Sequence, residues 1–336
     1  MLLLSVGVLL ALIVKFCGAD PREAFAALFR GAFGSTVAWG DTLKRTAVLA
    51  FLGLAVVLSF RAGLFNIGAD GQFVVGAMAA AALGVKILPV EVPWVLGVGA
   101  LFLTGALAGA GWSMVAGLLK QWRGVSEVIV TLMLNFLALV LLKYLVGYPQ
   151  FLRDSLTIEK KSALLPEGAQ LPGWGETSFH AGIFLAVPAV LALQALLFHT
   201  RAGLSLRATG LNPVAARACG IPVERVRLLV FGASGALAGW AGAMAVMADG
   251  RLTQNPPFPE YGFMAIAVAL AAGLYPLAVL PAAFGFAALE AGAKAMERSA
   301  NVPSDVVFLI EGVVILALLS RELRIPGGAE PGHSTV

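Results

Sequence analysis

Six polar side chains lie inside or beside long apolar runs of this chain, and they form two groups. The first group lies in FNIGADGQ, residues 65–72, and consists of Asn66, Asp70 and Gln72. Polar and ionisable groups at membrane depth are costly, so they indicate a function, and a direct contact with a polar substrate is one of two interpretations. Glycines inside an apolar run also indicate a broken helix, which transporters use near the bilayer midplane. In the alternative, architectural interpretation, Asp70 caps the next helix by accepting bonds from its free N–H groups.

The second group lies in SEVIVTLMLN, residues 126–135, where Glu127, Thr131 and Asn135 are spaced at i, i+4 and i+8. On a helix this spacing places the three side chains on one narrow stripe. In one interpretation the stripe faces the interior of the helix bundle and lines a permeation path. The alternative is a seam of hydrogen bonds between two helices, with Glu127 close enough to the helix end to stay hydrated.

Signals for other chemistry are weak. The GASG of residues 232–235 has the form of an intramembrane serine protease, which needs a base near the serine. Only His333 follows this serine, and it lies in the tail, so a small-residue helix contact is predicted. The chain has no Gly-Lys dipeptide and therefore no P-loop. Its two cysteines have neither metal-binding nor disulfide spacing. We expect no enzymatic activity, no metal and no cofactor.

The elements that carry these residues are membrane spans. The chain is 59% hydrophobic and 12% charged, whereas soluble domains carry roughly 25% charged residues. Its apolar runs are unbroken, which favours helices over the alternating strands of a β-barrel. The prediction is an all-α, polytopic helical bundle of about ten spans, at residues 1–17, 43–62, 69–88, 92–119, 126–147, 180–199, 224–247, 259–273, 275–292 and 304–320. The small net charge of +4 does not suggest nucleic acid.

The expected organisation is one transmembrane domain, residues 1–325, followed by a disordered cytoplasmic tail, residues 326–336. The first span lacks the basic start of a signal peptide, so we expect it to be retained; cleavage is the alternative. Residues 21–33 form either an interfacial helix or a packed connector helix. The arginines of the loop at 200–224 place that loop in the cytoplasm, and the polar loop at 148–179 outside.

A short helix is predicted within the cytoplasmic loop. Asn212 is a good N-cap and Pro213 suits the first helical position, while Gly220 is a natural residue just past the end. We expect a small, flat surface formed by Ala215, Ala216 and Ala218, with Arg217 projecting from it. Such a short helix is marginal in water, so flanking helices or a docked partner must hold it.

Small residues recur at the spacing of close helix packing. GALAGAG starts at Gly105, and SGALAGWAGA runs from Ser234 to Ala243. Both contain Gly-x-x-x-Gly, which lets helix backbones approach closely in lipid.

Several segments together resemble bacterial ABC importer permeases for simple sugars and nucleosides. LNPVAARACGIPVERVRLLVFGASGALAG resembles their cytoplasmic coupling segment, FRAGLFNIGADGQ their junction between the second and third spans, and GVSEVIVTLMLNF their fifth-span signature. HAGIF, YGFMAIAVAL and VPSDVVFLIEGVVIL follow in the family order, so the resemblance covers residues 18–319. The nucleoside-type branch has FNIGAEGQ; in this chain Asp70 stands in place of the glutamate.

The resemblance implies an importer in the plasma membrane of a bacterium. Two permease chains, identical or different, form the translocation pathway, two separate ABC ATPase subunits bind ATP, and an extracytoplasmic lipoprotein delivers the substrate. The short helix from Leu211 to Gly220 rests on an ATPase subunit and transmits its closure. The alternatives are a simple-sugar substrate, or an ion-coupled secondary transporter with Asp70 and Glu127 as its acids.

The chain departs from the family in two places. Met264 and Ala265 stand where the family has Asp-Gly, and Leu274 and Tyr275, before Pro276, stand where it often has Asn-His. These departures leave the choice of nucleoside or sugar open.

Overall fold

The computed structural model describes residues 20–173, 181–254 and 261–300, together with residues 11, 12, 14, 15 and 312. The predicted first and last spans and the tail lie almost wholly outside these residues. The described helices are α2 (Pro21–Phe33), α3 (Thr36–Arg61), α4 (Ala69–Lys86), α5 (Trp94–Arg123), α6 (Glu127–Gly147), the 3₁₀ turn η1 (Glu167–Ala169), α7 (Gly182–His199), α8 (Arg201–Leu211), α9 (Pro213–Ala218), α10 (Val223–Asp249), α11 (Tyr261–Ala271) and α12 (Pro276–Ala300).

Six of these helices are long and apolar enough to cross a membrane: α3, α5, α6, α7, α10 and α12. The shorter helix α11 is also apolar. The predicted all-helical, polytopic class is therefore confirmed for the described part of the chain. The helices fall into two compact units, one formed by residues 35–288 and the other by residues 1–34 with 289–336.

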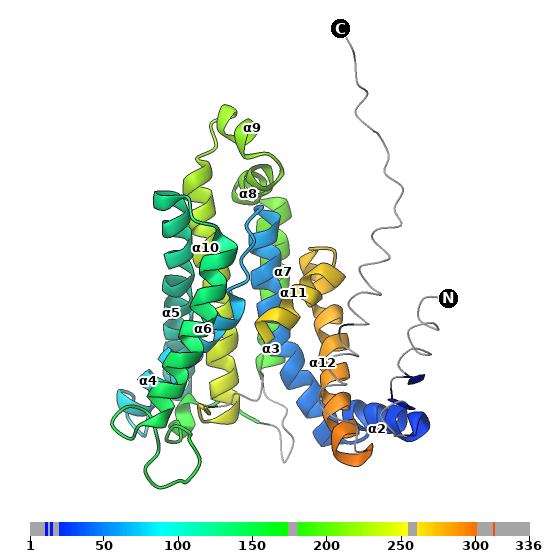
Figure 1. Ribbon diagram of the computed structural model, residues 1–336. Helices are drawn as coiled ribbons and strands as arrows, with labels where there is room; N and C mark the ends of the chain where they lie inside the picture. The colour runs from blue at the N-terminus through cyan, green and yellow to red at the C-terminus, as the bar shows by residue number, and fades with distance from the viewer. Residues whose placement is uncertain are drawn as a thin grey trace. The chain divides into compact units, whose positions relative to one another are not determined.

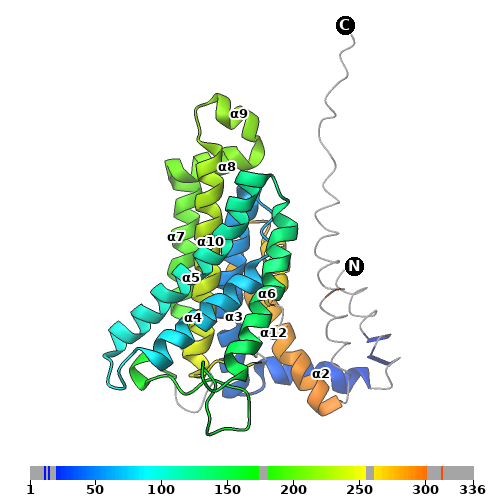
Figure 2. The same ribbon diagram turned by 60° about the vertical axis from the view of Figure 1, so that its left-hand side comes forward.

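In the larger unit, α10 is the central helix and packs against α5, α4 and α3. Helices α7 and α11 lie against α3, and α6 lies against α4. Figures 1 and 2 show α8 and α9 at one end of this unit and the loop that follows α6 at the opposite end. The loop and the short helix are thus separated by the full length of the spans, as the sequence predicts.

Helices α5 and α10 cross through glycines. Gly105 and Gly109 of α5 face Gly235 and Gly239 of α10, so closely that a Cβ atom on Gly239 would lie 2.0 Å from the carbonyl oxygen of Gly105. The same Gly239 touches Gly76 of α4. Because neither helix has a side chain at the crossing, backbone packs on backbone. This confirms the predicted close helix contact.

Helix α3 begins at Thr36, earlier than the predicted start at residue 43, and Ser35 caps it by accepting the N–H of Ala38 (3.1 Å). Its basic residues are paired within the unit. The Lys44 ammonium binds the carboxylate of Asp249, and Arg45 is buried with Nε 3.0 Å from Asp41 and Nη1 3.0 Å from the Tyr261 hydroxyl. Compensated charges of this kind are tolerated near the end of a span. The sequence alone does not show these partners.

The loop at residues 148–173 packs on the segment after α10. Isolated β-bridges join Arg153 to Ser162 and Lys161 to Thr253. The Asp154 carboxylate accepts a bond from the backbone N–H of Leu156 (2.9 Å) and pairs with Arg251 (3.1 Å). The Leu156 N–H, aided by Arg251, holds the pKa of Asp154 below its usual value.

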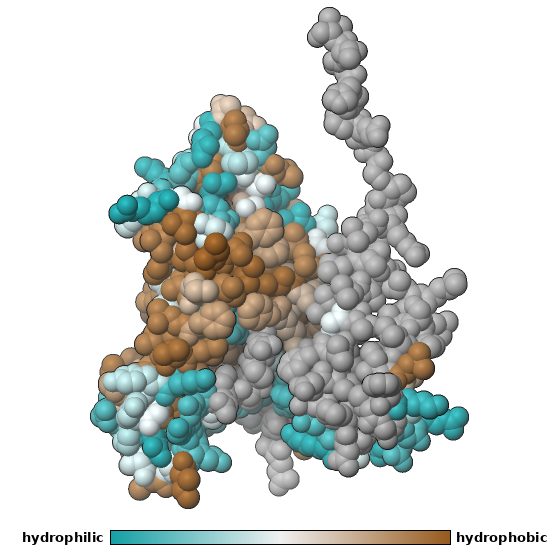
Figure 3. Space-filling model, in the orientation of Figure 1, coloured by the Kyte–Doolittle hydropathy of each residue, from teal (hydrophilic) through white to brown (hydrophobic). Residues whose placement is uncertain are grey.

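An apolar band covers the outside of the larger unit. Figure 3 shows brown residues in its middle and teal residues toward both ends on the face in view. The exposed apolar side chains on α5, α6 and α7 include Leu103, Leu107, Ile129, Met133, Phe136, Val140, Phe184 and Leu191. A soluble protein rarely exposes such a surface, so these residues face lipid or another subunit.

In the smaller unit, α2 packs against the second half of α12. Asp20 caps α2 by accepting the N–H of Arg22 (2.8 Å). Gly292 of α12 lies against the backbone of Leu28, and Phe29 is exposed. The residues at 21–33 therefore form a helix, as predicted, and this helix packs on a neighbour within its own unit.

Candidate functional site

The α3–α4 junction carries a buried network of neutral amides. Asn66 is 1% exposed, and its side-chain Nδ2–H groups donate to the Ser234 hydroxyl (3.0 Å) and to the side-chain oxygen Oε1 of Gln72 (3.2 Å). Its Oδ1 accepts from Gln72 Nε2 (3.0 Å) and from the Gly68 N–H (3.0 Å). Ser234 in turn donates to the carbonyl oxygen of Ala55 on α3 (2.9 Å). The network therefore ties the break between α3 and α4 to the central helix α10.

Ser234 belongs to the GASG sequence, which is predicted as a helix contact. Its hydroxyl is fully buried and has both a donor and an acceptor partner, which fits that prediction. What the sequence does not show is its pairing with Asn66, because 168 positions separate the two residues.

The stripe on α6 faces the same junction. Asn135, 3% exposed, accepts the N–H of Gly71 (2.9 Å) and donates to the carbonyl of Ile67 (3.0 Å). Thr131 donates to the carbonyl of Glu127 within its own helix (2.8 Å). Asn135 thus satisfies backbone groups that the break in the helix leaves without partners.

The two acids have partners outside the amide network. Asp70 is buried at the first turn of α4 and accepts the N–H of Gly262, at the start of α11 (3.2 Å). Glu127 begins α6 and forms an ion pair with Lys120 near the end of α5. The six predicted residues therefore gather around α4, but Glu127 belongs to the α5–α6 turn rather than to the amide network.

At the other predicted site, α9 forms as the sequence indicates. It spans Pro213–Ala218, and the Asn212 carbonyl oxygen Oδ1 accepts the N–H groups of Val214 and Ala215, both at 3.0 Å. Gly220 follows with a φ of +80°, which favours glycine. The signals for the beginning and end of the helix are local, so sequence is sufficient to place them.

The surface of α9 agrees with the predicted one except at Ala216. Ala215, Ala218 and Arg217 are exposed, as expected, whereas Ala216 is buried at 3% exposure. The guanidinium of Arg217 pairs with Glu224 of α10 (Nε–Oε1 3.0 Å) and so fixes α9 to α10. Val214 of α9 and Leu211, the last residue of α8, are 71% and 88% exposed, so an apolar pair lies uncovered at the junction of the two helices.

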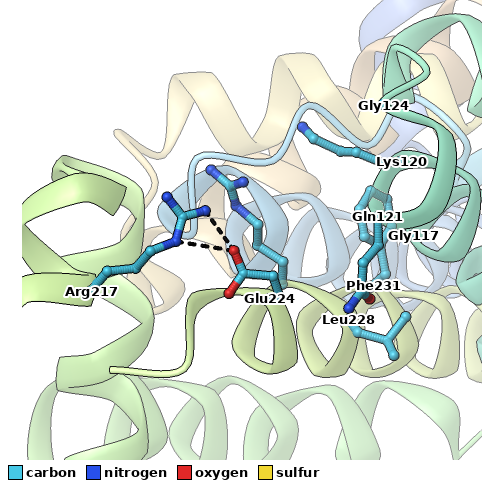
Figure 4. A pocket seen from close by; sticks show the side chains of 9 residues that line it. Gly117, Lys120, Gln121, Gly124, Arg217, Glu224, Leu228 and Phe231 are labelled. Atoms are coloured by element: carbon cyan, nitrogen blue, oxygen red, sulfur yellow. Dashed lines mark hydrogen bonds and ion pairs between the residues drawn. The ribbon is translucent and has the colours of Figure 1, made fainter. Parts of the chain in front are cut away.

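A cavity of about 280 Å³ separates α9 from the end of α5. Its charged lining residues are Lys120, Arg217, Glu224 and Arg227. Figure 4 shows Arg217 and Glu224 pointing toward one another on one side and Lys120 extending from the helix opposite. The sequence does not predict that Glu224 pairs with Arg217, because the two residues meet only through the turn after α9, which brings Glu224 back toward Arg217. The cavity leaves α9 room to move relative to α5.

Comparison with known proteins identifies the family. Residues 40–319 match the family described as "Branched-chain amino acid transport system / permease component". The chain belongs to this family. It is 33% identical to a glucose ABC transporter permease of Haloferax volcanii over 90% of this chain and 81% of that protein. It is 32% identical to a guanosine ABC transporter permease of Bacillus subtilis over 92% of this chain and 89% of that protein.

A solved structure shares the fold. A chain of a metal-chelate type ABC transporter in an inward-facing conformation superposes with a TM-score of 0.52 at 17% identity, covering 94% of this chain and 99% of that one. This likeness shows the fold alone. Membership in the family makes the chain a multi-pass permease subunit of an ABC transporter in the plasma membrane. Membership in the family argues against the two alternative hypotheses, an ion-coupled transporter and an intramembrane protease, because family members are transport subunits without catalytic activity or a cofactor.

Proposed function

We propose that this permease forms, with a second permease subunit, the translocation pathway of an importer for nucleosides. Two features support the nucleoside branch: FNIGADGQ resembles the sequence typical of that branch, and two relatives are named as guanosine and nucleoside permeases. A simple sugar is the second candidate substrate, favoured by the relative from Haloferax volcanii that is named as a glucose permease.

We propose that α8 and α9 lie in the cytoplasm and contact a separate ABC ATPase subunit. The observation that carries this proposal is the exposed apolar pair at one end of the bundle, formed by Leu211, the last residue of α8, and Val214 of the short, capped helix α9. Adjacent exposed apolar residues beside a capped helix offer a surface that a partner protein can cover. The residues of this coupling segment are Leu211, Asn212, Pro213, Ala215, Ala216, Arg217 and Gly220.

The remaining parts of the importer follow from the same proposal. The loop at 148–179 faces outside, where a substrate-binding lipoprotein delivers the substrate, and about ten spans include the two that lie at the chain's ends. We propose that Asn66, Asp70, Gln72, Glu127, Thr131 and Asn135 border the pathway. Because Asn66, Gln72 and Asn135 are buried and satisfied, their role is to fix the broken α3–α4 segment beside the substrate rather than to contact it first.

Uptake of labelled nucleoside, ribose and glucose tests the substrate, in cells with and without this chain, with and without ATP depletion at a maintained ion gradient. We expect ATP-dependent nucleoside uptake that is lost on deletion. Loss of sugar uptake alone would identify a simple sugar, the second candidate, as the substrate. Uptake that needs the chain but survives ATP depletion would contradict ATPase coupling.

A pair of variants tests the docking role of α9. Leu211→Asp and Val214→Asp place a charge on the exposed face, so we expect the folded permease to lose its co-purifying ATPase. Leu204→Asp is the matched control, because Leu204 is 60% exposed on α8, seven positions before Leu211 and away from α9. Equal retention of the ATPase by all three variants would contradict the docking role.

A further inference from the structure

Arg61, the last residue of α3, lies where four segments of the permease meet. Its Nε donates to the carbonyl oxygen of Leu274 in the turn between α11 and α12 (2.9 Å). Its Cζ lies 4.7 Å from the centre of the Tyr275 ring and 5.6 Å from that of Phe198, at the end of α7. A guanidinium stacks on aromatic faces and donates in its own plane at the same time. One side chain therefore joins α3, α7 and the α11–α12 turn.

The aromatic rings continue this contact to α8. Phe198 and Tyr275 are stacked, with centroids 5.8 Å apart and planes 9° from parallel. Arg207 of α8 lies over Phe198, with its Cζ 5.0 Å from the ring centre. Two arginines and two rings thus form one continuous stack between α8 and the α11–α12 turn.

The backbone of α8 also touches the end of α3 directly. A Cβ atom on Gly210 would lie 2.2 Å from the carbonyl oxygen of Arg61, so no side chain fits between the two segments. Gly210 lies two positions before Asn212, the cap of α9. A displacement of α9 that moves α8 must therefore displace Arg61 or separate these two segments.

The turn that Arg61 contacts is strained. Leu274 has a φ of +57°, in the left-handed region that is uncommon for a residue other than glycine or asparagine. Backbone strain persists only where the surrounding contacts over-determine the conformation, and it is concentrated at sites that move or bind. Here the contact from Arg61 to the Leu274 carbonyl helps to fix that conformation.

We propose that Arg61 is a positioning residue that passes the displacement of α8 and α9 to the α11–α12 turn and to the α3–α4 junction. This inference rests on the proposed coupling of α9 to an ATPase. Arg61 precedes the buried amide network by five positions, so the same movement reaches Asn66 along the chain. The stack connects α8, which leads into the proposed docking helix α9, with the α11–α12 turn, and Arg61 itself leads into the α3–α4 junction that borders the proposed pathway.

The test measures nucleosides transported per ATP hydrolysed, in proteoliposomes that contain the whole importer purified through this chain. Arg61→Gln removes the charge and the planar donor. We expect it to keep its ATPase subunits and their hydrolysis while transport per ATP falls by about fivefold or more, as for typical couplings between sites. Arg61→Lys keeps a cation near Tyr275 but loses the planar fork, so we expect an intermediate value.

The matched control is Arg201→Gln. Arg201 is exposed on α8, and its side chain has no hydrogen-bond or ion-pair partner in the described part of the chain. Wild-type transport per ATP is expected for this variant. An Arg61→Gln importer with wild-type transport per ATP would overturn the inference.

A double variant distinguishes a positioning role of Arg61 from simple stabilisation of the α11–α12 turn. Leu274→Gly removes the backbone strain of the turn. If Arg61 only stabilises the turn, the double variant Arg61→Gln with Leu274→Gly therefore regains normal transport per ATP, and that result would overturn the inference. We expect the double variant to remain uncoupled. If no ATPase subunit co-purifies with the wild-type chain, the proposed function itself is wrong, and the inference that rests on it is wrong as well.

Discussion

Gly239 is the residue where the structure makes the sharpest prediction about stability. In Gly239→Ala the new methyl group would lie 2.0 Å from the Gly105 carbonyl oxygen, whereas ordinary contacts begin at 3.4 Å. Helix α5 must therefore move from α10 by about 1.4 Å, the difference between these distances. Overpacking of this kind costs about 1–3 kcal/mol, and the better helix propensity of alanine offsets at most about 1 kcal/mol of it.

The matched control is Gly111→Ala, on the same helix α5. A Cβ atom at Gly111 meets no atom within 4 Å, so alanine there adds helix propensity without a clash. The assay is the fraction of purified protein that stays monodisperse in detergent after heating, measured by size-exclusion chromatography over a series of temperatures. We expect a lower melting temperature for Gly239→Ala and an unchanged or higher one for Gly111→Ala. Equal melting temperatures for the two variants would refute the argument that the crossing is closed to side chains.

The structure also predicts three smaller effects. Asn66→Ala removes both side-chain partners of the Gln72 amide and the donor to Ser234, which keeps its own bond to Ala55, so the free energy of unfolding should fall by about 1–3 kcal/mol; an unchanged melting temperature would show that water replaces the amide. Leu274→Asn relieves the left-handed strain and should raise that free energy by about 1 kcal/mol; a lower melting temperature would refute the strain. The lowered pKa of Asp154 stabilises its loop fully above the usual carboxyl pKa of 3.8 and loses this contribution as pH falls through the lowered value. Pepsin should therefore begin to cut the loop at a higher pH in Arg251→Gln than in the wild type, and identical profiles would exclude the contact.

The sequence predicts those features whose causes are local. Helix α9 has its N-cap, its proline and its terminal glycine within nine positions, so its bounds follow from the residues alone. The close contact of α5 and α10 follows from the repeated glycines of both helices. Apolar runs predict most of the described spans for the same reason, because length and composition decide them.

Features that depend on distant partners are not predictable in this way. The pairing that compensates the charge of Lys44 near the end of a span is with Asp249, which lies 205 positions away. The inward face of α9 depends on how α8 and α10 hold it, so a helix of alanines gives no sign that Ala216 is the buried one. The stack of Arg61 on Tyr275 brings together residues 214 positions apart, and neither has a local signal of pairing.

The crossing at Gly239 also limits how this permease can change over evolutionary time. Gly239 touches Gly76 of α4 as well as Gly105 of α5. A larger residue there would need two compensating changes on two helices, and each of those positions is already glycine, the smallest residue. No single substitution leads away from this arrangement without loss of stability. We therefore expect these three positions to stay fixed in relatives whose substrates differ, while the surrounding residues drift.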